Sequence, residues 1–414
     1  MHRWMLTLAL SLFTLAQATP LPELLQGVEV QPAVQTLQIQ LKETALKKNA
    51  PGLVPDLALK GDAGSAPDPI TAQQEWTGSV GAEITYGWIS ASQQRRQLDL
   101  EVQGLQTQLI ETRIRTLKDL LQTEWTYRKN KLSAAQAELD LRTQQLELKS
   151  RQARFQLGAL TEQQVKNAAL LVNRAELQLR QQQVGLKKSL ADLQRLKLTA
   201  PEVPTELPLP PETTSAETSE VLKTQQQVFE LQLKGQKLNL QQWPEVSLGA
   251  SYSNGHSSLS GSINQNLDTH LEYGYGFNSP ASPESWGLKL SARFGLDFTR
   301  TGQQDLNNQQ LQLTLDTLRD QQQQLQLFRA DLRMQLQQNQ ELLDLSKQVL
   351  QLSEAAVEQE KIRLNQGLVS ETAVLQVQSQ VLKEQQNMLE LEKALQDLAL
   401  QLWEVYTWYP QNGK

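Results

Sequence analysis

The feature that most constrains this chain is a long internal repeat. Apolar residues, mostly valine and leucine, recur at every seventh position from Val165 to Leu193, and the same spacing returns 209 positions later, from Val374 to Leu402. An apolar residue at every seventh position is typical of helices that pack side by side along a narrow seam. The constant offset between the two copies therefore predicts two structural repeats built from long helices.

A short motif precedes each seam. It reads RFQLGALT at 154–161 and RLNQGLVS at 363–370, which is Arg, three residues, Gly, two residues and then Ser or Thr. The glycine suits the left-handed residue that ends a helix, and the hydroxyl residue suits the cap that begins the next helix. The segments Leu98–Leu157 and Leu306–Gln366 contain no proline, so each is long enough for a rod of roughly 90 Å. Each motif thus predicts the tip of an antiparallel helical hairpin.

The first long segment carries two apolar seams on different flanks. One seam contains Trp125 and Leu132, and the other contains Leu141 and Leu148, each with a spacing of seven. The seams are displaced by two positions, which is roughly half a helical turn. A helix with two seams needs a neighbour on each side, so we expect a cylinder or sheet of helices.

Ahead of each long segment the apolar period changes from seven to two. Apolar and polar residues alternate over 76–88 and over 286–298, with weaker partners at 52–61 and 244–253. The longer intervening segment, 254–285, is expected to be a polar loop. Strands of this length favour a membrane-spanning sheet, although a soluble sandwich strand is the alternative. Aromatic residues near the strand ends predict a lipid-facing girdle: Trp76, Tyr86, Trp88, Trp286, Phe294 and Phe298.

Four such strands cannot close a barrel, because small barrels need about eight. Open strand edges are not tolerated in hydrocarbon, so several chains would have to share one barrel. The helices with two seams require neighbours for the same reason. The sequence therefore predicts a closed ring of subunits.

The start of the chain predicts export. A mostly apolar run, Trp4–Ala16, follows His2 and Arg3 and leads into Ala-Gln-Ala, which indicates a signal peptide at 1–18. The chain has no cysteine, which excludes disulfides and thiol chemistry, and its net charge of −6 gives no reason to expect nucleic acid as a partner. We expect a first repeat at 19–198, a proline-rich linker at 199–215, a second repeat at 216–409 and a tail at 410–414.

These features together resemble the TolC family of outer-membrane efflux proteins over about residues 20–409. The resemblance lies in the doubled helix–strand–strand–helix unit, the two R-x-x-x-G-x-x-[ST] tips, and the steps Tyr86-Gly87-Trp88 and Phe294-Gly295-Leu296. It implies a membrane α+β fold, in which a homotrimer builds a 12-stranded transmembrane β-barrel and a periplasmic α-helical tunnel. It also implies a passive exit duct in the cell outer membrane, serving tripartite efflux or type I secretion. The energy would come from an inner-membrane pump, reached through a periplasmic adaptor.

The resemblance also implies that the tips dock the adaptor. The docking residues would be Arg154, Gly158 and Thr161 in one tip and Arg363, Gly367 and Ser370 in the other. Arginine suits this role because its guanidinium offers a fork of donors, although Arg363 could instead pair with Glu360. The family's acidic residues beyond the second tip are missing here, so we expect Gln164 and Gln376 to form a neutral tunnel constriction.

Catalysis has little support in the sequence. His256 and His270 are expected to be solvated loop residues rather than metal ligands, and the nearby Tyr273-Gly274-Tyr275-Gly276 lacks the context of a phosphate-binding loop. We therefore expect no enzyme activity, no cofactor and no metal. Two other classes are kept as alternatives: a periplasmic adaptor, and a secreted structural coiled-coil protein.

Overall fold

The structure is a computed structural model that separates into two compact units. One contains residues 1–36, 109–218 and 324–414, and is here called the hairpin unit. The other contains residues 37–108 and 219–323, and is here called the sheet unit. The structure describes residues 21–49, 56–67, 74–198, 205–211, 217–242, 245–264, 266–277, 282–293 and 300–410. The predicted signal peptide lies outside the described residues.

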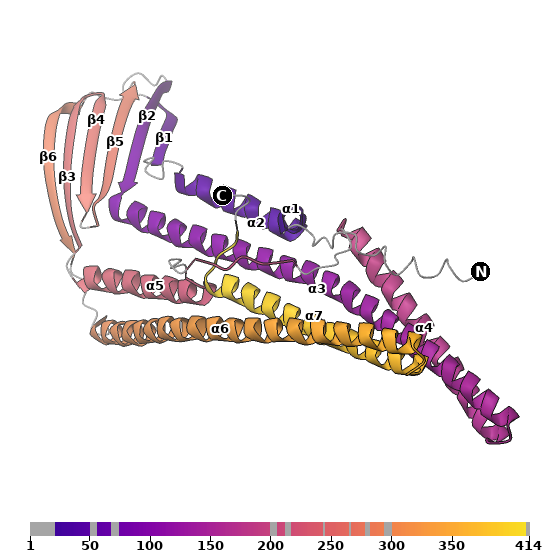
Figure 1. The fold of residues 1–414 in the computed structure, drawn as a ribbon. Helices are drawn as coiled ribbons and strands as arrows, with labels where there is room; N and C mark the ends of the chain where they lie inside the picture. Colours follow the sequence, from indigo (N-terminus) through magenta and orange to yellow (C-terminus); the bar gives the residue numbers. More distant parts are fainter. Residues whose placement is uncertain are drawn as a thin grey trace. The chain divides into compact units, whose positions relative to one another are not determined.

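The sheet unit contains one antiparallel sheet with the strand order β1-β2-β5-β4-β3-β6 (Figure 1). Its strands are β1 Asp56–Pro67, β2 Gln74–Gly87, β3 Glu245–Gly255, β4 Ser257–Asn264, β5 Asp268–Phe277 and β6 Ser282–Arg293. The expected α+β class is confirmed, and β1, β2, β3 and β6 correspond to the four predicted strands. The expected loop at 254–285 is wrong, because most of it forms β4 and β5, which lie between β2 and β3.

Several strand boundaries also differ from the prediction. Strand β1 runs on to Pro67, beyond the predicted end at residue 61, because residues 62–67 continue to pair with β2. Strand β2 ends at Gly87, so Trp88 is the first residue of a helix rather than the last residue of a strand. Strand β6 ends at Arg293, and Phe294 and Phe298 lie outside the described residues.

The helices confirm the two predicted hairpins. They are α1 Leu21–Glu29, α2 Pro32–Asn49, α3 Trp88–Gln156, α4 Glu162–Arg195, α5 Ser219–Gln242, α6 Arg300–Asn365 and α7 Glu371–Val405. The seven-residue seams face inward, since Val172, Leu193, Val374 and Leu402 are buried. None of the helices that the structure describes combines the length and the apolar character of a membrane span.

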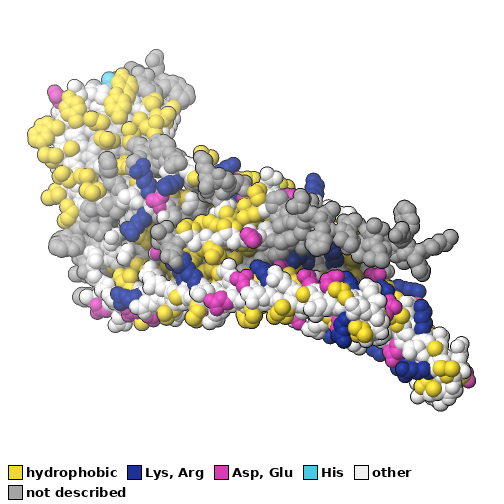
Figure 2. Space-filling view, viewed as in Figure 1, with side chains coloured by type: hydrophobic (Ala, Val, Ile, Leu, Met, Phe, Trp, Pro, Cys, Tyr) yellow, Lys and Arg dark blue, Asp and Glu magenta, His cyan; other side chains and the backbone are white. Residues whose placement is uncertain are grey.

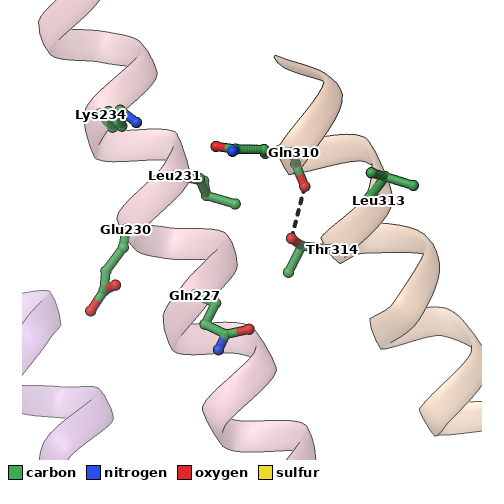
Figure 3. Close-up of a pocket in the computed structure, with 7 residues that line it drawn as sticks. All are labelled: Gln227, Glu230, Leu231, Lys234, Gln310, Leu313 and Thr314. Carbon is green, nitrogen blue, oxygen red and sulfur yellow. Dashed lines mark hydrogen bonds between the residues drawn. The ribbon is translucent and has the colours of Figure 1, made fainter. Parts of the chain in front are cut away.

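Within the sheet unit, α5 and α6 pack through a polar seam. The amide of Asn307 is almost fully buried and donates through Nδ2 to the carbonyl of Leu231 at 3.0 Å. A Cβ atom on Gly235 would lie 3.0 Å from that same nitrogen, so a larger residue at this point would require the Asn307 amide to shift. Beside the seam lies an open groove of about 480 Å³, lined by Gln227, Glu230, Leu231, Lys234, Gln310, Leu313 and Thr314. The carboxylate of Glu230 points away from α6 (Figure 3), so the groove does not gather charged groups into a site.

In the hairpin unit, the core lies where α6 meets the end of α7. It contains Leu332, Leu398, Leu402, Val405 and Tyr406. The described part of the linker, 205–211, has no helix or strand, as its prolines predicted. It is nevertheless held on α7, because Gln396 donates to the carbonyl of Thr205 at 2.8 Å and Trp403 donates to the carbonyl of Pro208 at 2.7 Å.

Candidate functional site

The first candidate surface is the pair of hairpin tips, and the first tip ends α3 in a Schellman turn. Gly158 has φ +71°, which is the left-handed region that favours glycine. Its amide donates to the carbonyl of Phe155 at 2.9 Å, and the amide of Ala159 donates to the carbonyl of Arg154 at 2.9 Å. This pair of bonds satisfies two carbonyls that the helix end would otherwise leave free.

The second tip repeats this backbone. Gly367 has φ +73°, its amide donates to the carbonyl of Leu364 at 2.9 Å, and the amide of Leu368 donates to the carbonyl of Arg363 at 2.9 Å. In each tip, the carbonyl of the motif arginine thus accepts the hydrogen bond that spans five residues, from the residue after the glycine. The predicted stop at each glycine is confirmed.

The caps that begin the returning helices are confirmed, but they differ between the tips. Thr161 forms a capping box, since its side chain accepts from the amide of Gln164 and its own amide donates to Gln164 Oε1 at 2.9 Å. Ser370 accepts from the amide of Ala373 but also bonds the hydroxyl of Thr372 at 2.7 Å. The side-chain oxygen of Gln164 is therefore engaged in capping.

The two arginines are both exposed, but they have different surroundings. Arg363 Nη1 lies 2.7 Å from Glu360 Oε1, which is the alternative contact that the sequence suggested. Within the part of the chain that the structure describes, the side chain of Arg154 forms no hydrogen bond or ion pair. The first tip thus presents an unpaired guanidinium, and the second presents one that a partner would share with Glu360.

Two tip features were not predicted from the sequence. A leucine next to each tip glycine is strongly exposed: the side chain of Leu157 is 84% accessible and that of Leu368 is 66% accessible. In addition, Glu371 lies 2.5 Å from Arg142 on α3, so the start of α7 contacts the first hairpin. A leucine beside a turn glycine could have signalled the first feature, whereas no local signal links residues 229 positions apart.

The second candidate surface is the sheet, whose apolar residues lie on one face. The row that runs from β1 to β6 contains Leu59, Ala82, Tyr273, Leu259, Tyr252 and Trp286. Leu59 and Trp286 are each 78% accessible. Figure 2 shows hydrophobic side chains gathered over these strands. An uncovered apolar face of this extent marks a surface that meets lipid or another protein.

The opposite face of the sheet is polar. Lys60 lies 2.5 Å from Glu83, and Glu83 lies 3.1 Å from Nδ1 of His270. Serines on neighbouring strands bond one another, as Ser253 and Ser285 do at 2.7 Å. One face is therefore apolar and the other is wettable, as a sheet between lipid and water requires.

Two loop predictions fail in strand β5. His270 and Tyr273-Gly274-Tyr275-Gly276 belong to β5, whereas His256 lies in the turn before β4. His256 packs edge to face on Tyr275, with ring centroids 6.2 Å apart. The alternation of Leu271, Tyr273 and Tyr275 with polar or small residues is the signal that could have identified this strand.

The predicted aromatic girdle is only partly described. Trp76 and Tyr86 belong to β2 and Trp286 belongs to β6, where Trp286 is exposed on the apolar face. Trp88 begins α3. A girdle at the level of lipid headgroups stays a prediction.

Comparison with known proteins gives a family match in the second repeat and a similar fold over most of the chain. Residues 217–405 match the outer membrane efflux protein family. The fold is similar to that of the outer membrane protein VceC from Vibrio cholerae, with a TM-score of 0.60 and 14% identity over 93% of this chain and 95% of that chain. It is also similar to a membrane protein from Pseudomonas aeruginosa, with a TM-score of 0.57 and 13% identity over 93% of this chain and 89% of that chain.

The CmeC outer membrane channel of Campylobacter jejuni has a TM-score of 0.52 and 10% identity, over 93% of this chain and 84% of that chain. No curated protein sequence matches this chain significantly. The predicted resemblance to outer-membrane efflux proteins is thus confirmed, by sequence in the second repeat and by fold over most of the chain.

Proposed function

From an efflux-family match in the second repeat and the fold of outer-membrane channels, we infer that this chain forms a passive exit duct across the outer membrane. The sheet carries the proposal, because it has an uncovered apolar face for lipid and a polar face for water. A periplasmic adaptor or a secreted coiled-coil protein would have no use for such a sheet. In this proposal the chain is a homotrimer with a helical tunnel in the periplasm, and it carries out no catalysis.

We further propose that the two tips dock a periplasmic adaptor, which connects the duct to an inner-membrane pump. Leu157 and Leu368 support this role, because an exposed leucine at the end of a hairpin can be buried only by a partner. Arg154 and Arg363 add donors for the carbonyls or carboxylates of an adaptor tip. Three chains would present six tips of one backbone geometry, which suits docking by six similar adaptor hairpins.

The constriction is proposed one turn inside the tips, at Gln164 and Gln376. Both side chains are exposed and uncharged. A neutral ring would let cations and anions pass alike, whereas an acidic ring would favour cations. We expect ion flow through an opened duct to be nearly unselective.

Site-specific cross-linking in cells tests the docking proposal. A photoreactive amino acid at Leu157 or Leu368 should capture a periplasmic adaptor, whereas the same group at Leu170, exposed on α4 away from the tip, should not. The double variant Leu157→Glu and Leu368→Glu should retain efflux substrates in the cell and still be extracted as a trimer. Unchanged efflux and unchanged capture in that variant would rule out tip docking.

A further inference from the structure

The hairpin unit contains a groove that has no role in the proposed function. It has a volume of about 870 Å³, is lined by α3, α6 and α7, and is here called the three-helix groove. We propose that the three-helix groove binds an organic cation whose body is apolar and about the size of a drug molecule. All three helices belong to one copy, so this binding does not require that the chain forms a duct.

The lining of the three-helix groove is regular. Each helix contributes residues spaced i, i+3, i+4 and i+7, which begin at Ala135 on α3, Gln351 on α6 and Gln378 on α7. This spacing places the residues of each helix on one face. Seven positions of a helix span roughly 10 Å, so the groove has room for a small molecule but is too short to seat a long helix of another protein.

Part of this lining is apolar. Val357 on α6 is buried, and Leu139 on α3 and Val381 and Leu382 on α7 are half-buried. A volume of about 870 Å³ lies within the range of sites that bury most of a drug-sized ligand. Contact between these side chains and an apolar ligand body removes apolar surface from water, which supplies the main attraction.

Two carboxylates give the three-helix groove its charge. Glu138 on α3 and Glu354 on α6 both line it, and both are exposed. Within the described part of the chain, neither side chain forms a hydrogen bond or an ion pair. The two carboxylates therefore attract a cation and repel an anion. Because they line the same groove from different helices, one ligand can interact with both.

The other charged residues of the groove are already paired. Arg142 lies 2.5 Å from Glu371 at the start of α7, and Glu358 lies 2.6 Å from Lys361. Each of these pairs balances its own charge. The unbalanced charge of the groove is therefore negative and comes from the two unpaired carboxylates.

An organic cation suits this groove better than a metal ion. Among the residues that the structure describes, no three carboxylate, histidine or cysteine side chains gather closely enough to hold a metal ion. A metal ion would also gain nothing from the apolar part of the lining. An organic cation uses both parts, because its body meets the leucine and valine side chains while its charge meets the carboxylates.

Fluorescence anisotropy with two matched dyes tests the proposal on the detergent-extracted full chain. Rhodamine 123 is a cation and fluorescein is an anion, and both have a xanthene ring system. Rhodamine 123 should bind, measured against empty micelles of the same detergent, whereas fluorescein should not. Equal binding of the two dyes, or no binding of rhodamine 123, would overturn the proposal.

Matched variants locate the binding. Glu138→Gln combined with Glu354→Gln should weaken rhodamine 123 binding about fivefold to tenfold, since exposed charge contacts contribute modestly. Glu341→Gln is the control, because Glu341 is an exposed carboxylate on α6 that lies outside the groove, and it should leave the affinity unchanged. The same affinity in the double variant and in the control would overturn the proposal.

Photo-cross-linking in cells distinguishes a small-molecule site from a protein interface. A photoreactive amino acid at Gln351, which is exposed and lines the groove, should give no protein adduct. An adduct with a second copy or with another protein would show that a macromolecule covers the groove, and would overturn the proposal while leaving the duct intact. A soluble monomer that binds rhodamine 123 through the two carboxylates would instead refute the proposed duct alone.

Discussion

At their tips the two repeats have the same backbone, whereas at the sheet they differ. Gly158 and Gly367 have φ of +71° and +73° and the same two turn hydrogen bonds. The first repeat nevertheless supplies two strands and the second supplies four. A tip is determined by about eight residues, so a duplicated sequence reproduces it. A sheet accepts an added hairpin because two more antiparallel strands preserve the direction of every neighbour.

The returning helices show a second difference, at their C-terminal ends. Trp403 on α7 is fully buried, stacks edge to face on Trp408 at 5.2 Å, and donates to Pro208. Its counterpart on α4, 209 positions earlier, is the exposed Gln194. At this position the second repeat buries a tryptophan and the first repeat exposes a glutamine, although the neighbouring Leu193 is buried.

The largest expected effect on stability comes from substituting Trp403, which tests the difference between the C-terminal ends of α4 and α7. Trp403→Ala should lower the free energy of unfolding by about 3–5 kcal/mol, because it leaves a cavity and an unpaired carbonyl. Gln194→Ala should change it by less than about 0.5 kcal/mol. Denaturant titration of the detergent-extracted protein measures both. Equal losses would mean that the two helix ends contribute equally to the free energy of unfolding.

Replacing the tip glycines should have the next largest effect on stability, and the effect should be the same in both repeats. Gly158→Ala and Gly367→Ala should each cost about 1–2 kcal/mol, because both glycines have positive φ and no neighbouring atom within 4 Å contributes a clash. Gly302→Ala, in α6, is the control and should be neutral or stabilising, since helical alanine is favoured over glycine. The same titration reports all three variants. A clear difference between the tip variants would contradict their equivalence.

Introducing glycine just after α4 and α7 should have a smaller effect on stability, and this effect should differ between the repeats. Two residues after the end of α4 and of α7 lies a non-glycine residue in the left-handed region, Lys197 with φ 58° and Thr407 with φ 46°. Lys197→Gly should stabilise by about 1 kcal/mol by removing the side-chain penalty. Thr407→Gly should gain little, because it also loses the bond from the threonine hydroxyl to the carbonyl of Glu217 at 2.9 Å. Melting temperatures in detergent check this, and an equal rise in both would refute the role of that bond.

Removing the carboxylate that pairs with Arg363 should have the smallest effect on stability. Glu360→Gln should cost at most about 1 kcal/mol, because the pair with Arg363 is exposed to solvent. It should also free the Arg363 guanidinium, making the second tip resemble the first. Adaptor cross-linking through Leu368 should then rise toward that through Leu157. If capture falls instead, Glu360 itself contacts the adaptor.

The sequence predicted the tips well because their rules are local. A glycine stop and a hydroxyl cap act within one turn of helix, and the seven-residue seams repeat many times along each helix. Strands β4 and β5 were missed because Ser257–Asn264 holds only two large apolar residues and because Gly274 and Gly276 are unusual within a strand. The pair between Arg142 and Glu371 was out of reach, since it depends on how the two hairpins pack.

The docked linker has a consequence for how this chain can evolve. Its two bonds to α7 run from the side chains of Gln396 and Trp403 to the backbone carbonyls of Thr205 and Pro208. A carbonyl is present whatever residue carries it. Selection at those two bonds therefore acts on the donors and on the path of the linker, and leaves its amino acids comparatively free to drift. We expect homologues to vary at exposed linker positions such as Pro208, while retaining the tryptophan and glutamine that hold the linker and the buried Thr205, whose hydroxyl donates to Glu124 at 3.4 Å.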